Sequence, residues 1–219
     1  VAGFVPITAI AGTAGYGKFT VDATGKWSYT MNNAQNQFVK DVTYTDTVTV
    51  NSIDGITKQV LTVNIVGTND AAVIGGVSSG AITESNVVQS AGGQLTITDV
   101  DNVSAFVPQT AVAGSSGYGK FTVDATGKWT YVMNTAHDEF VKDATYTDAV
   151  TVVSADGTSQ VLTVSIVGTN DAAVISGVNT AGLTESNTAQ TATGQLTITD
   201  VDSPAVFVAQ TSAVGDHGY

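Results

Sequence analysis

The sequence predicts an all-β protein built from tandem immunoglobulin-like β-sandwich repeats of about 101 residues. Three observations predict this fold class. The chain repeats itself, because 28 of the 36 residues in 15–50 are identical to their counterparts in 117–152. Within a repeat, apolar and polar residues alternate over short runs that are separated by glycine-containing turns. Valine, isoleucine and threonine, which suit a pleated sheet, are abundant in these runs.

The repeat period is set by the motif Gly-Thr-Asn-Asp-Ala-Ala-Val-Ile, which occurs at 67–74 and again at 168–175. On this period we expect 1–70 to be the C-terminal part of one repeat, 71–171 to be a complete repeat, and 172–219 to be the N-terminal part of the next. This register is typical of a slice from a longer tandem array. Completion of the first fragment by the tail of a neighbouring molecule is the alternative.

Strand runs within the complete repeat alternate with a period of two, so each should bury one face. The runs at 120–124 and 128–133 flank a short turn that contains Gly127, which predicts a hairpin. With no cysteine pair to join the sheets, Trp27 and Trp129 are expected to supply much of the core. The residues expected to be buried are Leu95, Ile97, Phe121, Val123, Trp129, Tyr131, Leu162, Val164 and Ile166.

Composition narrows the classes of function. The chain has seven Lys+Arg against 19 Asp+Glu, a net charge of -12, and no cysteine. Nucleic acids and anionic membranes require clustered positive charge, so neither is an expected partner. Disulfides, zinc–thiolate sites and thiol catalysis are excluded. No apolar run is long enough to cross a bilayer, and direct membrane insertion is not expected. The excess carboxylates either attract cations or serve as a solubilising surface.

Acidic residues recur at fixed intervals after the repeated motif. Calcium takes about six to eight oxygen ligands from carboxylates, carbonyls and water. Carboxylates gathered without a cation would repel one another. Turn capping explains any single acid, but it explains less well four that recur together. We therefore expect calcium at one junction and at its copy, with amide carbonyls as additional ligands. The two sets are Asn69, Asp70, Glu84, Asp99 and Asp101, and Asn170, Asp171, Glu185, Asp200 and Asp202.

Two further acids, Asp46 and Asp148, lie in phase with the buried valines of their strands. Such a residue either ligates a cation or accepts backbone hydrogen bonds, and the sequence favours neither. We include both among the candidate metal ligands. Asp54-Gly55 and Asp156-Gly157 are expected hairpin tips, for which turn chemistry is sufficient.

Signals for catalysis are sparse. His137 and His217 are not counterparts, and His137 is replaced by Gln35 in the first copy. The sequence contains no nucleophile elbow, phosphate-binding loop or paired-histidine zinc motif. We expect no enzymatic activity.

Three segments carry a family resemblance: the ending Val-Leu-Thr-Val-x-Ile-Val-Gly-Thr-Asn-Asp-Ala, the hairpin Gly-Lys-Phe-Thr-Val-Asp-Ala-Thr-Gly-Lys-Trp-x-Tyr, and Tyr-Thr-Asp-x-Val-Thr-Val. Together they resemble the VCBS repeat of bacterial RTX-type adhesins and biofilm proteins. The family often has proline where Ala72 and Ala173 stand. The resemblance implies a cadherin-like sandwich, calcium at the linkers and an extracellular location on the cell surface or in a secreted matrix. The cadherin analogy assigns the linker role to Asn69-Asp70 and its copy, the glutamate role to Glu84 and Glu185, and the Asp-x-Asp role to 99–101 and 200–202.

Two function hypotheses follow. In the first, the repeats are a calcium-stiffened extender of a large adhesin, whose partners are neighbouring repeats of the same chain or identical chains. In the second, each repeat binds polysaccharide or self-associates into an extracellular filament. Buried Trp27 and Trp129 would leave no aromatic platform for a sugar, whereas exposed ones would favour the second hypothesis.

Overall fold

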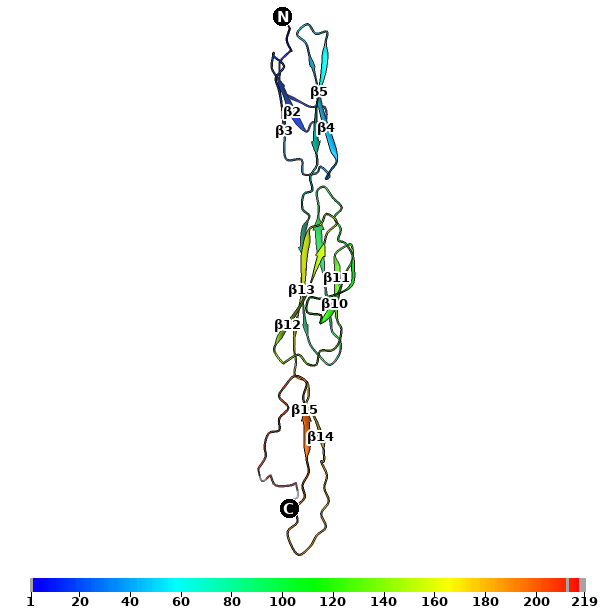
Figure 1. The fold of residues 1–219 in the computed structure, drawn as a ribbon, viewed down its shortest axis with the longest axis vertical. Helices are drawn as coiled ribbons and strands as arrows, with labels where there is room; N and C mark the ends of the chain where they lie inside the picture. The colour runs from blue at the N-terminus through cyan, green and yellow to red at the C-terminus, as the bar shows by residue number, and fades with distance from the viewer. Residues whose placement is uncertain (1, 212, 217–219) are drawn as a thin grey trace. The chain divides into compact units, whose positions relative to one another are not determined.

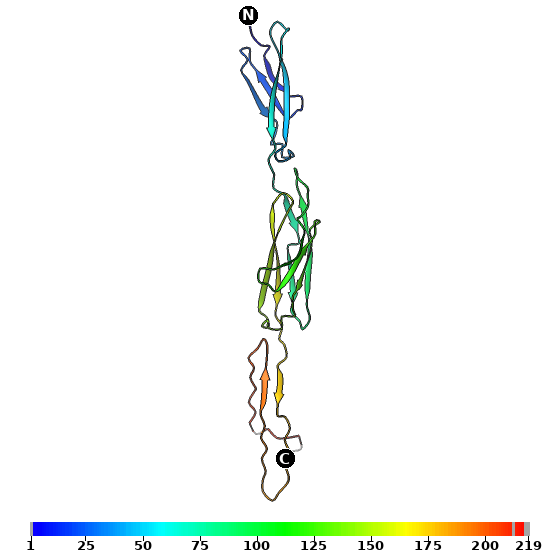
Figure 2. The same ribbon diagram turned by 45° about the vertical axis from the view of Figure 1, so that its right-hand side comes forward.

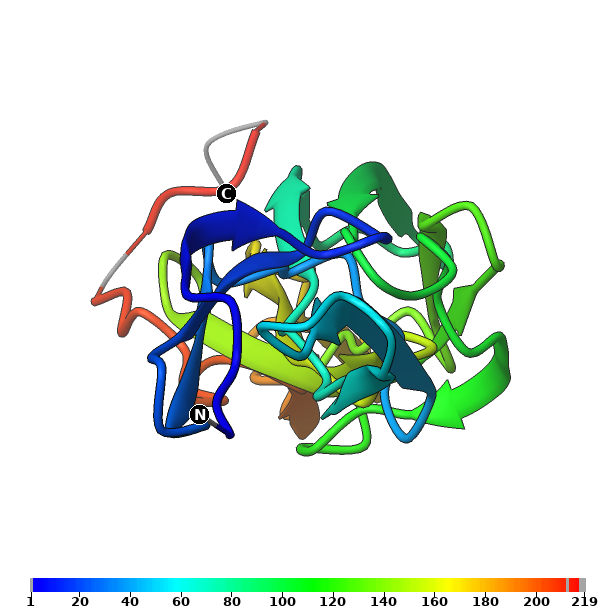
Figure 3. The same cartoon turned by 90° about the horizontal axis from the view of Figure 1, so that it is seen from above.

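Every regular element of the described chain is a β-strand, in a computed structural model that describes residues 2–211 and 213–216. Strands and loops account for all of these residues (Figure 1, Figure 3). His217 lies outside the described residues. The predicted all-β fold class is confirmed. Within the described part, no helix is long and apolar enough to cross a membrane.

The chain divides into two compact units, which we describe separately. The first contains residues 1–75, 96–107 and 153–159, and the second contains 76–95, 108–152 and 160–219. The repeat boundaries at 70/71 and 171/172 stay predictions.

The N-terminal strands, at the blue end of the colour scale, form a three-stranded and a two-stranded sheet (Figure 1). A small core of Phe19, Val21, Val48 and Val50 lies between them. The three-stranded sheet has the order β1-β2-β3, with bounds Ile7–Ala11, Gly17–Val21 and Trp27–Met31, and the other sheet pairs β4 (Thr43–Asn51) with β5 (Lys58–Val66).

Residues 73–167, within the predicted complete repeat, form a five-stranded and a three-stranded sheet. One has the order β6-β8-β11-β10-β9, with bounds Val73–Gly76, Ser90–Thr98, Lys128–Met133, Gly119–Val123 and Gln109–Ala113. The other has the order β12-β13-β7, with bounds Thr145–Val153, Ser159–Val167 and Ser79–Thr83. The hairpin predicted around Gly127 is present, because β10 pairs antiparallel with β11 and Val123 lies opposite Trp129. Gly127 itself has φ 85°, a left-handed conformation that glycine adopts without strain.

Alternation along the strands places one face of each sheet in the core. Eight of the nine residues expected to be buried are 0 to 1% exposed. The exception is Ile97, which is half-buried because it lies near the end of β8, two residues before the Asp99 loop.

The two tryptophans differ, and the prediction that both lie in the core is wrong for Trp27. Trp129 is 1% exposed and Trp27 is 46% exposed. Trp129 lies opposite Gly93 of β8, and its indole N–H donates to the Val77 carbonyl at 2.7 Å. Trp27 belongs to β3, which within the described residues pairs only with β2. One flank of its indole therefore has no covering strand.

The C-terminal segment contains one short antiparallel pair, β14 (Val174–Gly177) with β15 (Leu196–Thr199), drawn side by side in both Figure 1 and Figure 2. Residues 178–195 between them contain no strand.

The alternating core predicts a matched pair of substitutions on β13. Leu162→Ala should lower the free energy of unfolding by about 2–5 kcal/mol, because it leaves a cavity in a packed core. Its neighbour Val161 is 50% exposed, so Val161→Ala should cost well under half as much. Chemical denaturation in chelator measures both, and equal losses would contradict the assigned register.

Candidate metal centres

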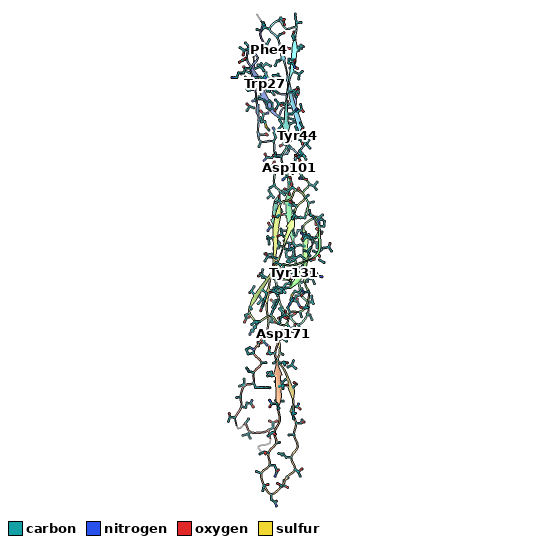
Figure 4. All side chains as sticks on the ribbon, in the orientation of Figure 1. Phe4, Trp27, Tyr44, Asp101, Tyr131 and Asp171 are labelled. Carbon is teal, nitrogen blue, oxygen red and sulfur yellow. The ribbon has the colours of Figure 1, made fainter. Side chains whose placement is uncertain are left out.

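Asp70, Asp99 and Asp101 come together in the first unit. Asp99 and Asp101 lie in the loop after β8, where Asp99 Oδ1 accepts the N–H groups of Asp101 at 3.1 Å and Asn102 at 2.8 Å. The Asp101 carboxylate accepts the Asp70 N–H, with each oxygen 3.4 Å from the nitrogen. Figure 4 labels Asp101. The second oxygen of Asp99 is buried and has no hydrogen-bond partner.

Burial raises the pKa of Asp101, and the neighbouring carboxylates of Asp99 and Asp70 raise it further against the hydrogen bond from the Asp70 N–H. A bound cation would reverse this electrostatic cost, because it favours the ionised carboxylates.

Asp156, which the sequence analysis assigned only to a hairpin tip, also binds the linker in the first unit. Its Oδ2 accepts the Ala72 N–H at 3.0 Å, the Thr158 hydroxyl at 2.7 Å and the Asn69 amide at 3.3 Å. The Ser154 hydroxyl, the strongest contributor, holds its pKa below the ordinary range. Asp156 therefore anchors the linker by hydrogen bonds. The only signal in the sequence was the repeated Asp-Gly pair.

Glu84, Asp138 and Asp171 come together in the second unit. One carboxylate oxygen from each lies within 4.8 Å of the other two. Glu84 is 2% exposed, and its Oε2 accepts the Thr169 N–H at 2.9 Å and the Thr169 hydroxyl at 2.6 Å. Its Oε1 has no partner.

The expected grouping of Glu84 with Asp70, Asp99 and Asp101 needs correction, because the structure places Glu84 beside Asp171. The reason is the direction of β7, which runs parallel to β13 with Thr83 opposite Val167. The residue after β7 is consequently held at the end of β13, where the Glu84 N–H donates to the Val167 carbonyl at 2.8 Å.

Asp171, labelled in Figure 4, connects Glu84 to the acids that follow. Its Oδ1 accepts the Asn86 amide at 2.8 Å, and its N–H donates to Asp202 Oδ1 at 3.3 Å. Asp200 Oδ1 accepts the N–H groups of Asp202 and Ser203, the same turn as at Asp99. Burial raises the pKa of Asp171, and the charges of Glu84, Asp138 and Asp202 add to the effect.

Asp138 was not among the expected ligands, and its counterpart in the first copy is Asn36. It follows His137, whose Nε2 lies 2.9 Å from the Tyr118 carbonyl and whose Nδ1 lies 2.7 Å from Glu139 Oε1. These contacts hold the loop that carries Asp138, so the role of His137 is to stabilise that loop. The signal in the sequence that could have identified Asp138 is its charge, because its counterpart Asn36 is neutral.

The remaining candidates are Glu185 and the two asparagines, Asn69 and Asn170. Glu185 is exposed in the strand-free segment 178–195. The amides of Asn69 and Asn170 each donate to the carbonyl of the following aspartate, at 3.1 and 2.8 Å. Their side-chain oxygens lie 3.5 Å from Asn102 Nδ2 and 3.4 Å from Ser203 Oγ.

Asp46 and Asp148 are fully buried and act as hydrogen-bond acceptors. Asp46 accepts the N–H groups of Ala14, Tyr16 and Gly17 and the Tyr29 hydroxyl at 2.9 to 3.2 Å. Burial acts to raise the pKa of Asp46, but these hydrogen bonds outweigh it and lower the pKa. Asp148 repeats the arrangement, with the Tyr131 hydroxyl at 3.0 Å. This geometry favours the acceptor role over the cation role.

Free carboxylate oxygens mark the two clusters. Among the residues that the structure describes, six buried side-chain oxygens or nitrogens have no hydrogen-bond partner, and five of them belong to these acids. Buried polar atoms are normally paired, and unpaired ones call for an explanation such as an ion. Hard oxygen donors suit calcium, so the residues present fit that ion. The five atoms are Glu84 Oε1, Asp99 Oδ2, Asp138 Oδ1, Asp171 Oδ2 and Asp202 Oδ2.

Comparison with known proteins gives one family match and several structural neighbours. The family model described as "Bacterial cadherin-like domain" matches residues 69–168. No curated protein matches the chain. The neighbours include PcdhgB3 EC1-4 (13% identity, TM-score 0.41), the protocadherin GammaB4 extracellular domain (15%, 0.41) and Drosophila N-cadherin EC1-4 (16%, 0.38).

These alignments cover 93%, 93% and 80% of the chain and 50%, 32% and 44% of the respective neighbours. The chain thus spans at most half the length of each of these structures. Over residues 69–168 it is similar to a bacterial cadherin-like domain, and this match supports a cadherin-like repeat.

Proposed function

We propose that the chain is an extender segment of a bacterial cell-surface adhesin or biofilm-matrix protein, in which calcium binds at the junctions between repeats and stiffens them. The observation that carries the proposal is the set of five buried carboxylate oxygens without partners, all of which lie in the two acidic clusters. An extracellular location is part of the proposal and rests on the similarity of residues 69–168 to a bacterial cadherin-like domain.

Electrostatics supports a cation at these clusters. Among the described residues, the one close contact between a basic and an acidic side chain joins His137 to Glu139, so no lysine neutralises the acids. Glu84, Asp138, Asp171 and Asp202 each have a free oxygen in the second unit. A divalent ion could bind these free oxygens if it accepts many oxygen ligands in a flexible geometry. Calcium meets this condition more readily than magnesium.

The mechanical part of the proposal follows from where the acids lie in the sequence. Asp70 and Asp171 belong to the repeated motif that follows the last strand of a repeat, and Asp101 and Asp202 belong to the loop that follows β8 and β15. An ion shared between the two segments would cross-link the linker to that loop. The role of the ion would be to restrict motion of the linker.

The exposed Trp27 does not favour polysaccharide binding. Its counterpart Trp129 is 1% exposed in the complete repeat, where β8 covers it. Exposure is therefore not a property of the repeat, and we do not propose a sugar platform.

Calcium titration by calorimetry of the 219-residue chain tests the proposal. We expect saturable binding that Asp171→Asn and Glu84→Gln each weaken by about tenfold or more, because each removes a charged ligand from the same ion. Asp124 lies in an exposed hairpin turn, so Asp124→Asn is the matched control and should bind as the parent chain does. The absence of saturable binding, or equal affinity in all variants, would refute a calcium site.

The difference between Asp138 and Asn36 predicts two unequal junctions. Asp138→Asn should weaken the tightest class of sites and leave the other class unchanged, because it gives the second cluster the neutral side chain that stands in the first copy. Asn36→Asp is the reciprocal variant and should leave the second cluster unaffected. Calorimetry resolves the two classes, and a uniform loss over all sites would contradict the assignment.

Chelation should loosen the joint without unfolding the repeat. The chain has no cysteine, so spin labels can be attached at Lys18→Cys and Lys120→Cys, two exposed positions on β2 and β10. Removal of calcium should broaden the distribution of distances between the labels, while the circular dichroism of the β-sheets stays the same. An unchanged distribution would contradict the stiffening role, even if calcium binds.

A further inference from the structure

Three acids of the second unit hold one carboxylate oxygen in hydrogen bonds and leave the other oxygen buried and without a partner. The free oxygens are Glu84 Oε1, Asp171 Oδ2 and Asp202 Oδ2. The held oxygens each accept from a neighbour: Glu84 Oε2 from the Thr169 N–H and hydroxyl, Asp171 Oδ1 from the Asn86 amide, and Asp202 Oδ1 from the Asp171 N–H. Because the same division recurs in three carboxylates, it calls for a common explanation.

A buried carboxylate with a purely structural role differs from these three. Asp46 has both oxygens in use, since Oδ1 accepts two backbone N–H groups and Oδ2 accepts two more and the Tyr29 hydroxyl. Buried polar atoms are normally paired, so a buried oxygen that the fold leaves without a donor is available to a bound ion. The donors on the other oxygen therefore decide which oxygen the acid presents.

The repeated motif places Thr169 beside Glu84. The Glu84 N–H donates to the last carbonyl of β13 at 2.8 Å, which continues the parallel pairing with β7. The Thr169 N–H then donates back at 2.9 Å, and its acceptor is the Glu84 side chain. Gly168 allows this close approach, because a Cβ there would lie 2.4 Å from the Val141 carbonyl oxygen, in the loop that carries Asp138. The glycine and threonine of the motif thus bring the loop, the hydroxyl and the acid together.

We propose that Thr169 is a positioning residue, which holds Glu84 so that a single oxygen, Oε1, binds the calcium ion. The N–H and O–H groups on Oε2 direct their positive ends at that oxygen, so a cation beside it would be repelled. Asn86 does the same for Asp171 and leaves Oδ2 for the ion. The inference rests on the proposed function, because the ion is the calcium proposed there.

Binding through single oxygens has a consequence for the strength of the site. Carboxylates can bind calcium through one or both oxygens. One oxygen each from Glu84, Asp138 and Asp171 gives three ligands. Calcium takes about six to eight oxygens, so about half of the positions remain for carbonyl oxygens and water. The affinity then depends on how firmly each single oxygen is held, because each acid contributes one contact.

Infrared spectroscopy of the 219-residue chain, with ¹³C at the glutamate carboxylates, tests the proposal. The label isolates Glu84, Glu139 and Glu185, and Glu84→Gln identifies the Glu84 bands. A carboxylate that binds a cation through one oxygen has a wider separation between its antisymmetric and symmetric stretches than the free ion, whereas binding through both oxygens narrows it. We expect the Glu84 separation to widen when calcium replaces chelator. A narrower separation would overturn the proposal.

Thr169→Val should weaken calcium binding at the second cluster by about tenfold in calorimetry, because the ion must then order a carboxylate that the hydroxyl no longer holds. The Glu84 bands should become a mixture of one-oxygen and two-oxygen forms. Thr169→Ser keeps the hydroxyl and should restore both the affinity and the single form. Thr163→Val is the matched control, because Thr163 is also half-buried but lies opposite Ser79, at the other end of the β7–β13 pairing.

Asn86→Ala is a second test that leaves the core intact, because Asn86 is exposed. It should weaken calcium binding by about tenfold and leave the Glu84 bands unchanged, since the lost hydrogen bond belongs to Asp171. If the parent chain binds calcium and either variant binds it as tightly, the positioning role of that residue is refuted and the calcium site stands. If the parent chain shows no calcium-dependent change, both are refuted.

Discussion

Pairing of β7 with β13 is the interaction on which both the core and the acidic cluster depend. The parallel register from Thr163–Ser79 to Val167–Thr83 covers the buried side chains of β13 and places Glu84 at its end. The two parts of the chain with closely similar sequence show what this pairing does. With β7 in place, Leu162, Val164 and Ile166 are fully buried, and without an equivalent strand Leu61, Val63 and Ile65 are half-exposed. Packing against β7 thus decides how deeply these side chains are buried, whereas β5 is a strand without such a partner among the described residues.

Repulsion between carboxylates opposes this packing, because the fold brings several acidic side chains together at a few loops. Burial raises the pKa of Asp171 while three neighbouring acids add to the shift. Asp46 is also buried, yet the N–H groups and hydroxyl around it lower its pKa. Two acids in similar burial thus differ in what surrounds them: Asp46 has its donors within the fold, whereas the junction acids keep free oxygens. This contrast separates structural carboxylates from candidate ligands.

Alternation and internal repetition were sufficient to predict the all-β class and eight of nine core positions, because both depend on local sequence. Trp27 could not be placed in this way, because alternation does not show whether a neighbouring strand covers a residue: β8 covers Trp129, whereas β3 pairs only with β2 among the described residues. The partner of Glu84 was missed for the same reason, because sequence spacing does not give the direction of a strand or its neighbour in a sheet. Asp138 was missed because its counterpart Asn36 is uncharged, and recurrence was the criterion used for ligands.

Several sequence differences between the two copies lie beside the second acidic cluster. Of the eight substitutions between 15–50 and 117–152, three are consecutive: Gln35, Asn36 and Gln37 become His137, Asp138 and Glu139. The backbone is the same in both loops, since Gln35 and His137 both have positive φ, 56° and 62°. Nε of each side chain faces the equivalent carbonyl, of Tyr16 or Tyr118. The scaffold is thus kept while the charge presented beside the repeated Thr-Asn-Asp changes. Variation of this kind would tune how strongly each junction attracts a cation without altering the sheets that carry it.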